Sequence, residues 1–442
     1  MSIFIQKRTF MLHLSQRKFV YIFSFILVVY LVLRILNGNY FLNDSYEYLK
    51  TVELLKSGEY FSSTEDISKS ILLTQRGLTY PIFLLIFDQL SFNAILIIQT
   101  FFGFFNLLLI SSIFKKLGGS NYFYLSLLLF FSPAVFIYTH LIMTEFLAFF
   151  LILCIFNFAL NFNKKRNLIY IQFFLTLLVF LKPVFYFFPF INAFFLIYIS
   201  IKQKKQYYLL SLIPIAAVIL YMGFNENRTG YNHFSSMQNI NLINYNIYLH
   251  KVKSNGVENA DLWKKNLYNK VDTFDSFSER SKYLSTVGKN YITENFISYS
   301  IFHLYGSLRG TLDPGRFDLM TFSNEPYDSK QGLLNILNTE KTFSAIKGLL
   351  QTKRIWVILL LIPILLVNIV KILYSLMYLL KTRKKLSFSI IFISTLIIYY
   401  IVLTGPVNAS RYMMPIQGVL IILSSLYLNN YFKHNKKQHN PK

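Results

Sequence analysis

Long apolar runs recur along the whole chain and limit its fold more than any other feature. Hydrophobic residues make up 54% of the 442 residues and charged residues only 14%, whereas a typical soluble domain carries about 25% charged residues. A run near 20 residues is long enough to cross a hydrocarbon core about 30 Å thick as a helix. We therefore predict an all-α polytopic membrane protein with about ten transmembrane helices. The runs are 19–37, 93–113, 121–138, 142–162, 167–181, 184–201, 207–224, 355–375, 387–404 and 412–432.

The charges between the runs predict how the chain is oriented. Cytoplasmic loops of membrane proteins carry an excess of lysine and arginine. With the N-terminus inside, the basic segments 115–116, 164–166, 202–205, 381–385 and the tail all face inward, and all 20 Asp and Glu residues fall on the outward side. We expect both termini in the cytoplasm and the chain in a bacterial inner (plasma) membrane. The net charge of +24 then reflects topology and attraction to anionic membrane lipids, and argues against a nucleic-acid partner.

The runs divide the chain into three parts. Residues 1–224 form an N-terminal transmembrane module of about seven spans, whose first run we interpret as a retained signal anchor. Residues 225–353 form a large outward segment. Residues 354–442 form a C-terminal module of about three spans with a basic cytoplasmic tail.

Both outward segments contain stretches that fit interfacial helices. The first outward loop, 38–92, holds the apolar stretch 80–90, which is too short to cross a membrane and fits a helix lying at its surface. In the large segment we predict helices at 258–270 and 278–305. The later part of the second, 296–308, is aromatic and amphipathic and fits a helix resting on the membrane.

Asp44 follows the first run closely and lies near the outer interface. A carboxylate there can accept a proton from an attacking hydroxyl or hold a divalent cation. The alternative is an ordinary helix N-cap, because Glu47 stands at the third following position, as in a capping box. The two roles can coexist.

Glu145 and Lys182 also stand at outward ends of apolar runs. An acid in so apolar a context costs on the order of 2.5–3.5 kcal/mol if it lies at the membrane centre, although a helix start favours an acid through the macrodipole. Lys182 lies between two runs that leave almost no loop. It either snorkels toward lipid head groups or binds a phosphate near the membrane surface.

Outward arginines are the second group of candidates, because the positive-inside bias does not explain them. Arg411 begins the last run, and Arg76 lies in the first outward loop. Arg309 and Arg316 flank a turn signal at 313–315. A guanidinium is well suited to binding phosphate through two hydrogen bonds.

The topology restricts what kind of donor these groups could use. The outer compartment offers no nucleotide pool, so an outward transferase needs an activated donor that arrives in the membrane. A lipid-linked phosphosugar fits, because its phosphate would bind the basic residues and its tail would lie between apolar spans.

An ordered set of short motifs then resembles the GT-C superfamily of integral membrane glycosyltransferases. The likeness is to the bacterial branch related to protein O-mannosyltransferases and the lipid A aminoarabinose transferase. The motifs are Asn43-Asp44-Ser45 with Tyr48, Arg76-Gly77-Leu78-Thr79-Tyr80-Pro81, Ser132-Pro133 through Thr144-Glu145, Lys182-Pro183, Leu308-Arg309-Gly310 with Asp313-Pro314-Gly315, and Arg411-Tyr412 with Pro415.

This resemblance implies an inverting sugar transfer from a polyprenyl-phosphate donor to a glycan, lipid or protein acceptor. Asp44 would be the base, and Glu145 would position the acceptor or a metal. Lys182 and Arg411 would hold the donor phosphate.

Other motif residues, Arg76, Tyr80, Arg309 and Tyr412, would contact substrate. A divalent cation, Mg²⁺ or Mn²⁺, would find its ligand in Asp44 or Glu145. However, Asn43 precedes Asp44 where several relatives carry adjacent acids. The large outward segment has no counterpart in the family pattern, and we expect it to select the acceptor.

Two other classes share part of this pattern. An O-antigen-type polymerase or ligase also has many spans, a large outward loop and outward arginines, but the Asp44 and Arg76 motifs argue against it. A lipid-linked glycan flippase or transporter usually shows inverted repeats and charges near the midplane. The chain shows no repeat, and we expect Lys371 at the inner end of its run.

Overall fold

The computed structural model describes residues 13–324, 355–383, 387–407 and 409–439, and all regular structure within them is helical. The end of the predicted outward segment, 325–353, and the basic residues Lys384 and Lys385 lie outside the described residues.

The helices of the N-terminal part are α1 (Gln16–Asn37), α2 (Asn43–Ser57), η1 (Glu59–Phe61), α3 (Ile67–Gln75), α4 (Thr79–Ile86), α5 (Phe92–Lys116), α6 (Phe123–Phe130), α7 (Ala134–Thr139), α8 (Glu145–Ala159), α9 (Lys165–Leu181), η2 (Pro183–Phe185), α10 (Phe188–Gln203), η3 (Tyr207–Ser211) and α11 (Leu212–Thr229). The segment 225–353, which is predicted to face outward and is called the outward segment below, contains α12 (Met237–Asn241), the π-helix η4 (Leu242–Ile247), α13 (Tyr248–Asn255), α14 (Val257–Val271), α15 (Phe277–Glu294), α16 (Phe296–Leu312) and α17 (Arg316–Phe322). The loop 38–92 likewise keeps its predicted name, the first outward loop. The C-terminal part contains α20 (Ile355–Thr382), α21 (Phe388–Thr404), η7 (Gly405–Val407) and α22 (Ser410–His439).

Five of the described helical segments are long and apolar enough to cross a membrane. They are 22 to 25 residues long, and their mean hydropathy lies between 1.3 and 2.6. Three shorter apolar helices, α8, α10 and α21, accompany them. The chain is therefore a helical membrane protein, and the total of ten spans stays a prediction. The five segments are Gln16–Asn37, Phe92–Lys116, Tyr207–Thr229, Leu359–Thr382 and Ser410–Phe432.

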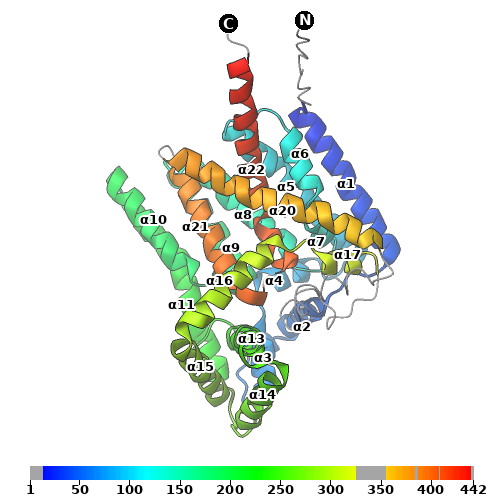
Figure 1. Cartoon of the computed structure of the whole chain (residues 1–442). Coiled ribbons are helices and arrows are strands. Elements are labelled where there is room, and N and C mark those ends of the chain that lie inside the picture. Colours follow the sequence, from blue (N-terminus) through cyan, green and yellow to red (C-terminus); the bar gives the residue numbers. More distant parts are fainter. Residues whose placement is uncertain (1–12, 325–354, 384–386, 408, 440–442) are drawn as a thin grey trace, which may run out of the picture.

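Only part of the outward segment lies at one end of the molecule, because α16 and α17 run back to contact α20 and α7 (Figure 1). The start of α1 and the end of α22 lie together at the top of the view, and α13, α14 and α15 lie at the opposite end. Helix α8 lies at the centre and contacts α5, α9 and α22. Its residues from Glu145 to Phe149 are all buried, so this short helix is surrounded by protein.

Two predicted helices are each broken into two. The run 121–138 is interrupted between α6 and α7, because Pro133 lacks a backbone N–H and disfavours helical backbone at Ser132. The stretch 278–305 is likewise divided at Asn295 into α15 and α16. Apolar content concealed the first of these breaks.

The position of Lys371 differs from the prediction. Because α20 continues to Thr382, Lys371 lies well inside the helix, and it is only 1% exposed. Its Nζ donates to Ser132 Oγ at 3.0 Å and to Gln417 Oε1 at 2.5 Å. The lysine therefore joins the break between α6 and α7 to α20 and α22.

Candidate active site

A cavity of about 220 Å³ lies where the first outward loop, the starts of α8 and α22, and the outward segment meet. Four of its lining residues are charged and come from widely separated parts of the chain. They are Asp44, Arg76, Lys182 and Arg411.

The start of α2 places Asp44 at the cavity. Helix α2 begins at Asn43 with Leu42 as its N-cap residue, so the alternative that Asp44 is the N-cap is wrong. The hydroxyl of Ser45, three positions after the cap, accepts from the backbone N–H of Leu42 at 2.9 Å. Because the serine completes the cap, the Asp44 carboxylate is available for other contacts.

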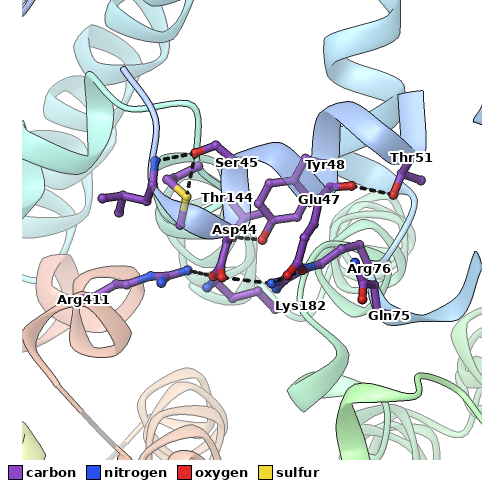
Figure 2. Close-up of polar contacts among 12 residues, drawn as sticks. Asp44, Ser45, Glu47, Tyr48, Thr51, Gln75, Arg76, Thr144, Lys182 and Arg411 are labelled. Carbon is purple, nitrogen blue, oxygen red and sulfur yellow. Dashed lines mark hydrogen bonds and ion pairs between the residues drawn. The ribbon is translucent and has the colours of Figure 1, made fainter. Parts of the chain in front are cut away.

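Asp44 lies between two arginines (Figure 2). One carboxylate oxygen pairs with Arg76 Nη2 at 3.0 Å, and the other accepts from Arg411 Nη2. Burial alone would raise the pKa of Asp44, but the two guanidinium groups outweigh it and lower the pKa to about 2. The carboxylate is thus ionised and fully engaged.

Glu145 is the first residue of α8 and is completely buried. Its Oε1 accepts from Lys182 Nζ at 3.1 Å and from Arg411 Nε at 3.0 Å. A buried carboxylate is stable only when it is paired, and the helix N-terminus adds to its stabilisation. Arg411 therefore bridges the two acids that the sequence analysis singled out, Asp44 and Glu145.

Arg76 extends the network on the opposite side of Asp44. Its Nε and Nη2 donate to Glu47 Oε2, each at 2.5 Å, and its guanidinium lies 5.1 Å from the centre of the Tyr48 ring. The six side chains that alternate in sign are called the charge cluster below. They are Glu47, Arg76, Asp44, Arg411, Glu145 and Lys182.

A close backbone contact holds Arg76 and Lys182 near each other. Gly77 packs directly against the carbonyl of Phe180, so closely that a Cβ on residue 77 would overlap it. Gly77 follows Arg76, and Phe180 precedes Lys182 by two residues. The absence of a side chain at residue 77 thus brings the end of α9 to the first outward loop.

Two carboxylates outside the cavity hold the start of α22, and sequence reasoning assigned them no role in the site. Asp313 accepts from the backbone N–H of Ser410 at 2.9 Å. Asp318 accepts from the hydroxyls of Ser410 and Tyr138, each at 2.6 Å. Burial raises the pKa of Asp318 to about 7, against the effect of these two hydrogen bonds. Since Arg411 follows Ser410, these hydrogen bonds fix the position of the backbone from which the Arg411 side chain extends.

The remaining predicted residues divide into two groups. Tyr412 lines the cavity. Tyr80 is fully buried behind it, where its hydroxyl donates to Gln99 Oε1 at 3.1 Å and its ring packs edge-on against Tyr48; this favours a structural role. Arg309, at the end of α16, is not among the residues that line the cavity.

The cluster does not fit a divalent cation. Asp44 and Glu145, the predicted ligands, already bind three cationic side chains, and a metal would have to displace them. No group of three His, Cys, Asp or Glu side chains suited to a metal occurs in the part of the chain that the structure describes. No chemical step is therefore assigned to a metal.

The face that the cluster turns toward the cavity is positive. Three of the four charged lining residues are cations and only Asp44 is an anion, which leaves a charge of +2 at the wall. Glu145 and Glu47 pair with these cations but do not line the cavity. An anion that enters the cavity would therefore contact mainly cationic side chains.

Comparison with protein-family models, with curated proteins and with solved structures finds no match for this chain. The fold and the site together define a membrane protein whose described part is helical, with a charge cluster around the buried Glu145 that borders a cavity.

Proposed function

We propose that this protein is a membrane glycosyltransferase of the hexosyl- or pentosyltransferase class. It would move a sugar from a polyprenyl-phosphate donor to a lipid, glycan or protein acceptor on the outer face of the membrane. The observation that carries the proposal is the excess of cations over anions at the wall of the cavity: Arg76, Lys182 and Arg411 against Asp44. The ordered resemblance to the GT-C superfamily supports the same class.

A phosphate suits this wall because it can replace the carboxylates as the partner of the guanidinium groups. Arg76 and Arg411 bind Asp44 from two sides, and arginine binds carboxylate and phosphate with the same planar geometry. A donor phosphate would therefore exchange one anionic partner for another without leaving a buried cation unpaired.

Apolar residues beside the cations suit a lipid-linked donor. The same cavity is lined by Leu181 at the end of α9, by Pro183 and Val184 of η2, and by Leu403 near the end of α21. A prenyl chain attached to the phosphate could continue along this apolar side toward the lipid. A free nucleotide sugar has no apolar tail that could bind to this side of the cavity.

The proposed step is an attack by an acceptor hydroxyl on the anomeric carbon. The new bond joins that carbon to the acceptor oxygen, and the bond to the phosphate oxygen breaks with its electron pair remaining on the phosphate. The hydroxyl proton passes to Asp44, and the three cations stabilise the charge that develops on the leaving group.

Donor binding would also activate Asp44. With its pKa near 2 in the ion-paired state, the carboxylate is a weak base. When the donor phosphate draws Arg76 and Arg411 toward itself, the charges that lower this pKa are partly neutralised. The pKa of Asp44 then rises toward its ordinary value, and the carboxylate becomes a better proton acceptor.

The test is a mass analysis of lipid-linked and surface glycans in cells with and without this chain. We expect cells that lack it to lose a sugar from one surface glycan and to accumulate the polyprenyl-phosphate sugar. Re-expression of the wild-type chain restores the glycan, and expression of Asp44→Asn does not. Identical glycans in the two strains would contradict the proposal.

A second measurement separates this class from its rivals. Purified protein in vesicles receives a polyprenyl-phosphate sugar together with a membrane extract as the source of acceptor. Formation of a glycosylated product supports a transferase. Movement of the donor across the bilayer without product would indicate a flippase, and product only from pyrophosphate-linked oligosaccharides would indicate a polymerase or ligase.

A further inference from the structure

One wall of the cavity carries polar groups but no charge. It comes from α12 and the π-helix η4 in the large outward segment, which line the same cavity as the cations. Asn241, Tyr245 and Asn246 are the polar side chains that it contributes. These three residues are called the neutral wall below.

The π-helix explains how three polar residues come to share one face. In an α-helix, residues 241 and 245 lie on the same face, but residue 246 is turned well away from them. A π-helix places more residues in each turn, because its hydrogen bonds run from residue i to i+5, and such turns occur frequently at functional sites. Asn246 thereby joins Asn241 and Tyr245 at the cavity.

The neutral wall is anchored firmly behind the face it presents. Ile243 and Ile247 are completely buried in a separate hydrophobic cluster with residues of α14 and α16. Asn244 Oδ1 accepts from the hydroxyl of Tyr268 at 2.8 Å. Asn246 lines the cavity, and its side chain is also hydrogen-bonded to Tyr299, so part of its hydrogen-bonding capacity is already used. The face toward the cavity contrasts with this, because Tyr245 remains 45% exposed.

The chemistry of the neutral wall selects an uncharged ligand rich in hydroxyl groups. A side-chain amide offers two donors and an acceptor, and a phenol offers one of each. Such groups match hydroxyls that both donate and accept. They offer no charge to a second phosphate, and their polar atoms would be left unsatisfied by an alkyl chain.

We propose that the neutral wall binds the sugar ring of the donor while Arg76, Lys182 and Arg411 bind its phosphate. This inference rests on the proposed function and assigns the sugar to the side of the cavity formed by α12 and η4. The outward segment would then determine which sugar is transferred, in addition to any contact it makes with the acceptor.

The experiment measures binding of two kinds of probe to the purified full-length protein in lipid nanodiscs. One probe is bare polyprenyl phosphate, and the other is a panel of polyprenyl-phosphate glucose, mannose, galactose and N-acetylglucosamine. We expect the wild-type protein to bind at least one glycosylated probe more tightly than the bare phosphate. Asn241→Ala and Tyr245→Ala should each lower the affinity for that probe by about 2- to 10-fold and leave the affinity for the bare phosphate unchanged.

Two further variants serve as references. Arg411→Gln should lower the affinity for both kinds of probe. Asn244→Ala is the matched control, because it lies in the same π-helix but bonds to Tyr268 away from the cavity; it should lower thermal stability and keep the preference for the glycosylated probe.

The outcomes distinguish this inference from the proposed function. If neither kind of probe binds the wild-type protein, the proposed function fails and this inference with it. If both bind equally well, or if Asn241→Ala and Tyr245→Ala weaken the bare phosphate as much as the sugar-bearing probe, the sugar site is wrong. The proposed function then still stands on the phosphate contacts.

Discussion

Arg228 and Arg411 differ in the charge of their hydrogen-bond partners. Those of Arg228 are neutral, and those of Arg411 are carboxylates. Arg228, at the end of α11, donates to the backbone carbonyls of Tyr60 at 2.7 Å and Leu73 at 2.8 Å, and to Asn225 Oδ1. Arg411 donates to the carboxylates of Asp44 and Glu145 and lines a cavity.

The difference shows which buried cation can serve a ligand. Backbone carbonyls cannot leave their helix ends, so Arg228 joins the first outward loop permanently to α11. A carboxylate partner is itself charged and can be exchanged for another anion. The burial of an arginine therefore says little about its role until the nature of its partners is known.

The largest expected effect comes from removing the acid that Arg411 shares with Arg76. Asp44→Asn keeps the size of the side chain but removes the base, and transfer should fall by about 10²- to 10⁴-fold. The measurement is sugar transfer by purified protein in vesicles. Glu47→Gln is the control, because Glu47 also binds Arg76 but does not line the cavity; a loss there as large as that of Asp44→Asn would contradict the role of Asp44.

Exchanging each arginine for glutamine tests the comparison directly. Arg411→Gln should lower the affinity for a polyprenyl-phosphate sugar by about 10- to 100-fold, since charged hydrogen bonds are worth roughly 1.5–3 kcal/mol. Arg228→Gln should leave that affinity nearly intact in the folded protein. If the folded Arg228 variant loses donor affinity as strongly as the Arg411 variant, the distinction between the two arginines is wrong.

The same pair should show the reverse order in stability. Arg228→Gln leaves two buried carbonyls without their donor, at a cost of about 1–3 kcal/mol each. Its thermal unfolding midpoint in detergent should therefore fall clearly. An unchanged midpoint would show that other groups or water satisfy the Tyr60 and Leu73 carbonyls.

Asp318 should make stability depend on pH. Its folded pKa is raised from 3.8 to about 7, so the folded state binds more protons than the unfolded state between these values. Its contribution to the free energy of unfolding is fully present below about pH 3.8 and is lost as the pH rises through about 7. In detergent, Asp318→Asn should flatten the decline of the thermal midpoint over this range. An unchanged slope would mean that another group is responsible.

The smallest expected effect is at Gly315, which sets the turn before α17. Its φ of +79° is unfavourable for other residues, by roughly 1–2 kcal/mol, and a Cβ there would lie 2.7 Å from Asp318 Oδ2 and 3.2 Å from Ser410 Oγ. Gly315→Ala should therefore reduce both stability and donor affinity. Gly58→Ala is the control, because Gly58 has a similar φ and no atom within 4 Å of the added Cβ; equal effects would remove any role for the contact with Ser410.

The helical character of the chain could be predicted from the sequence, because apolar runs of membrane length carry that information locally. The boundaries could not always be predicted. The break at Ser132-Pro133 lies inside an apolar run, and α20 extends past its apolar run to Thr382, so Lys371 lies deeper than expected. Asp44 resembled an N-cap by local pattern, yet the N-cap is Leu42, and the capping hydrogen bond runs from its backbone N–H to the hydroxyl of Ser45.

Part of the charge cluster was predicted because ionisable residues at the ends of apolar runs are unusual, and because an outward basic residue runs against the positive-inside bias. This signal pointed to Asp44, Glu145, Lys182 and Arg411. It could not point to Asn241 or Tyr245, because an amide or a phenol in a polar segment has nothing unusual about it. It also missed Arg228, whose partners are backbone carbonyls more than 150 residues away in the chain.

The pairing of Glu145 with Arg411 has a consequence for biogenesis. The two residues are separated by 266 positions, which takes about 13 to 53 s to synthesise at about 5–20 residues per second. Glu145 must enter the membrane long before its arginine exists, whereas Lys182 follows only 37 positions later. Lys182 is therefore synthesised first of the two cationic partners of Glu145, and the pairing with Arg411 forms only after α22 has begun to be synthesised.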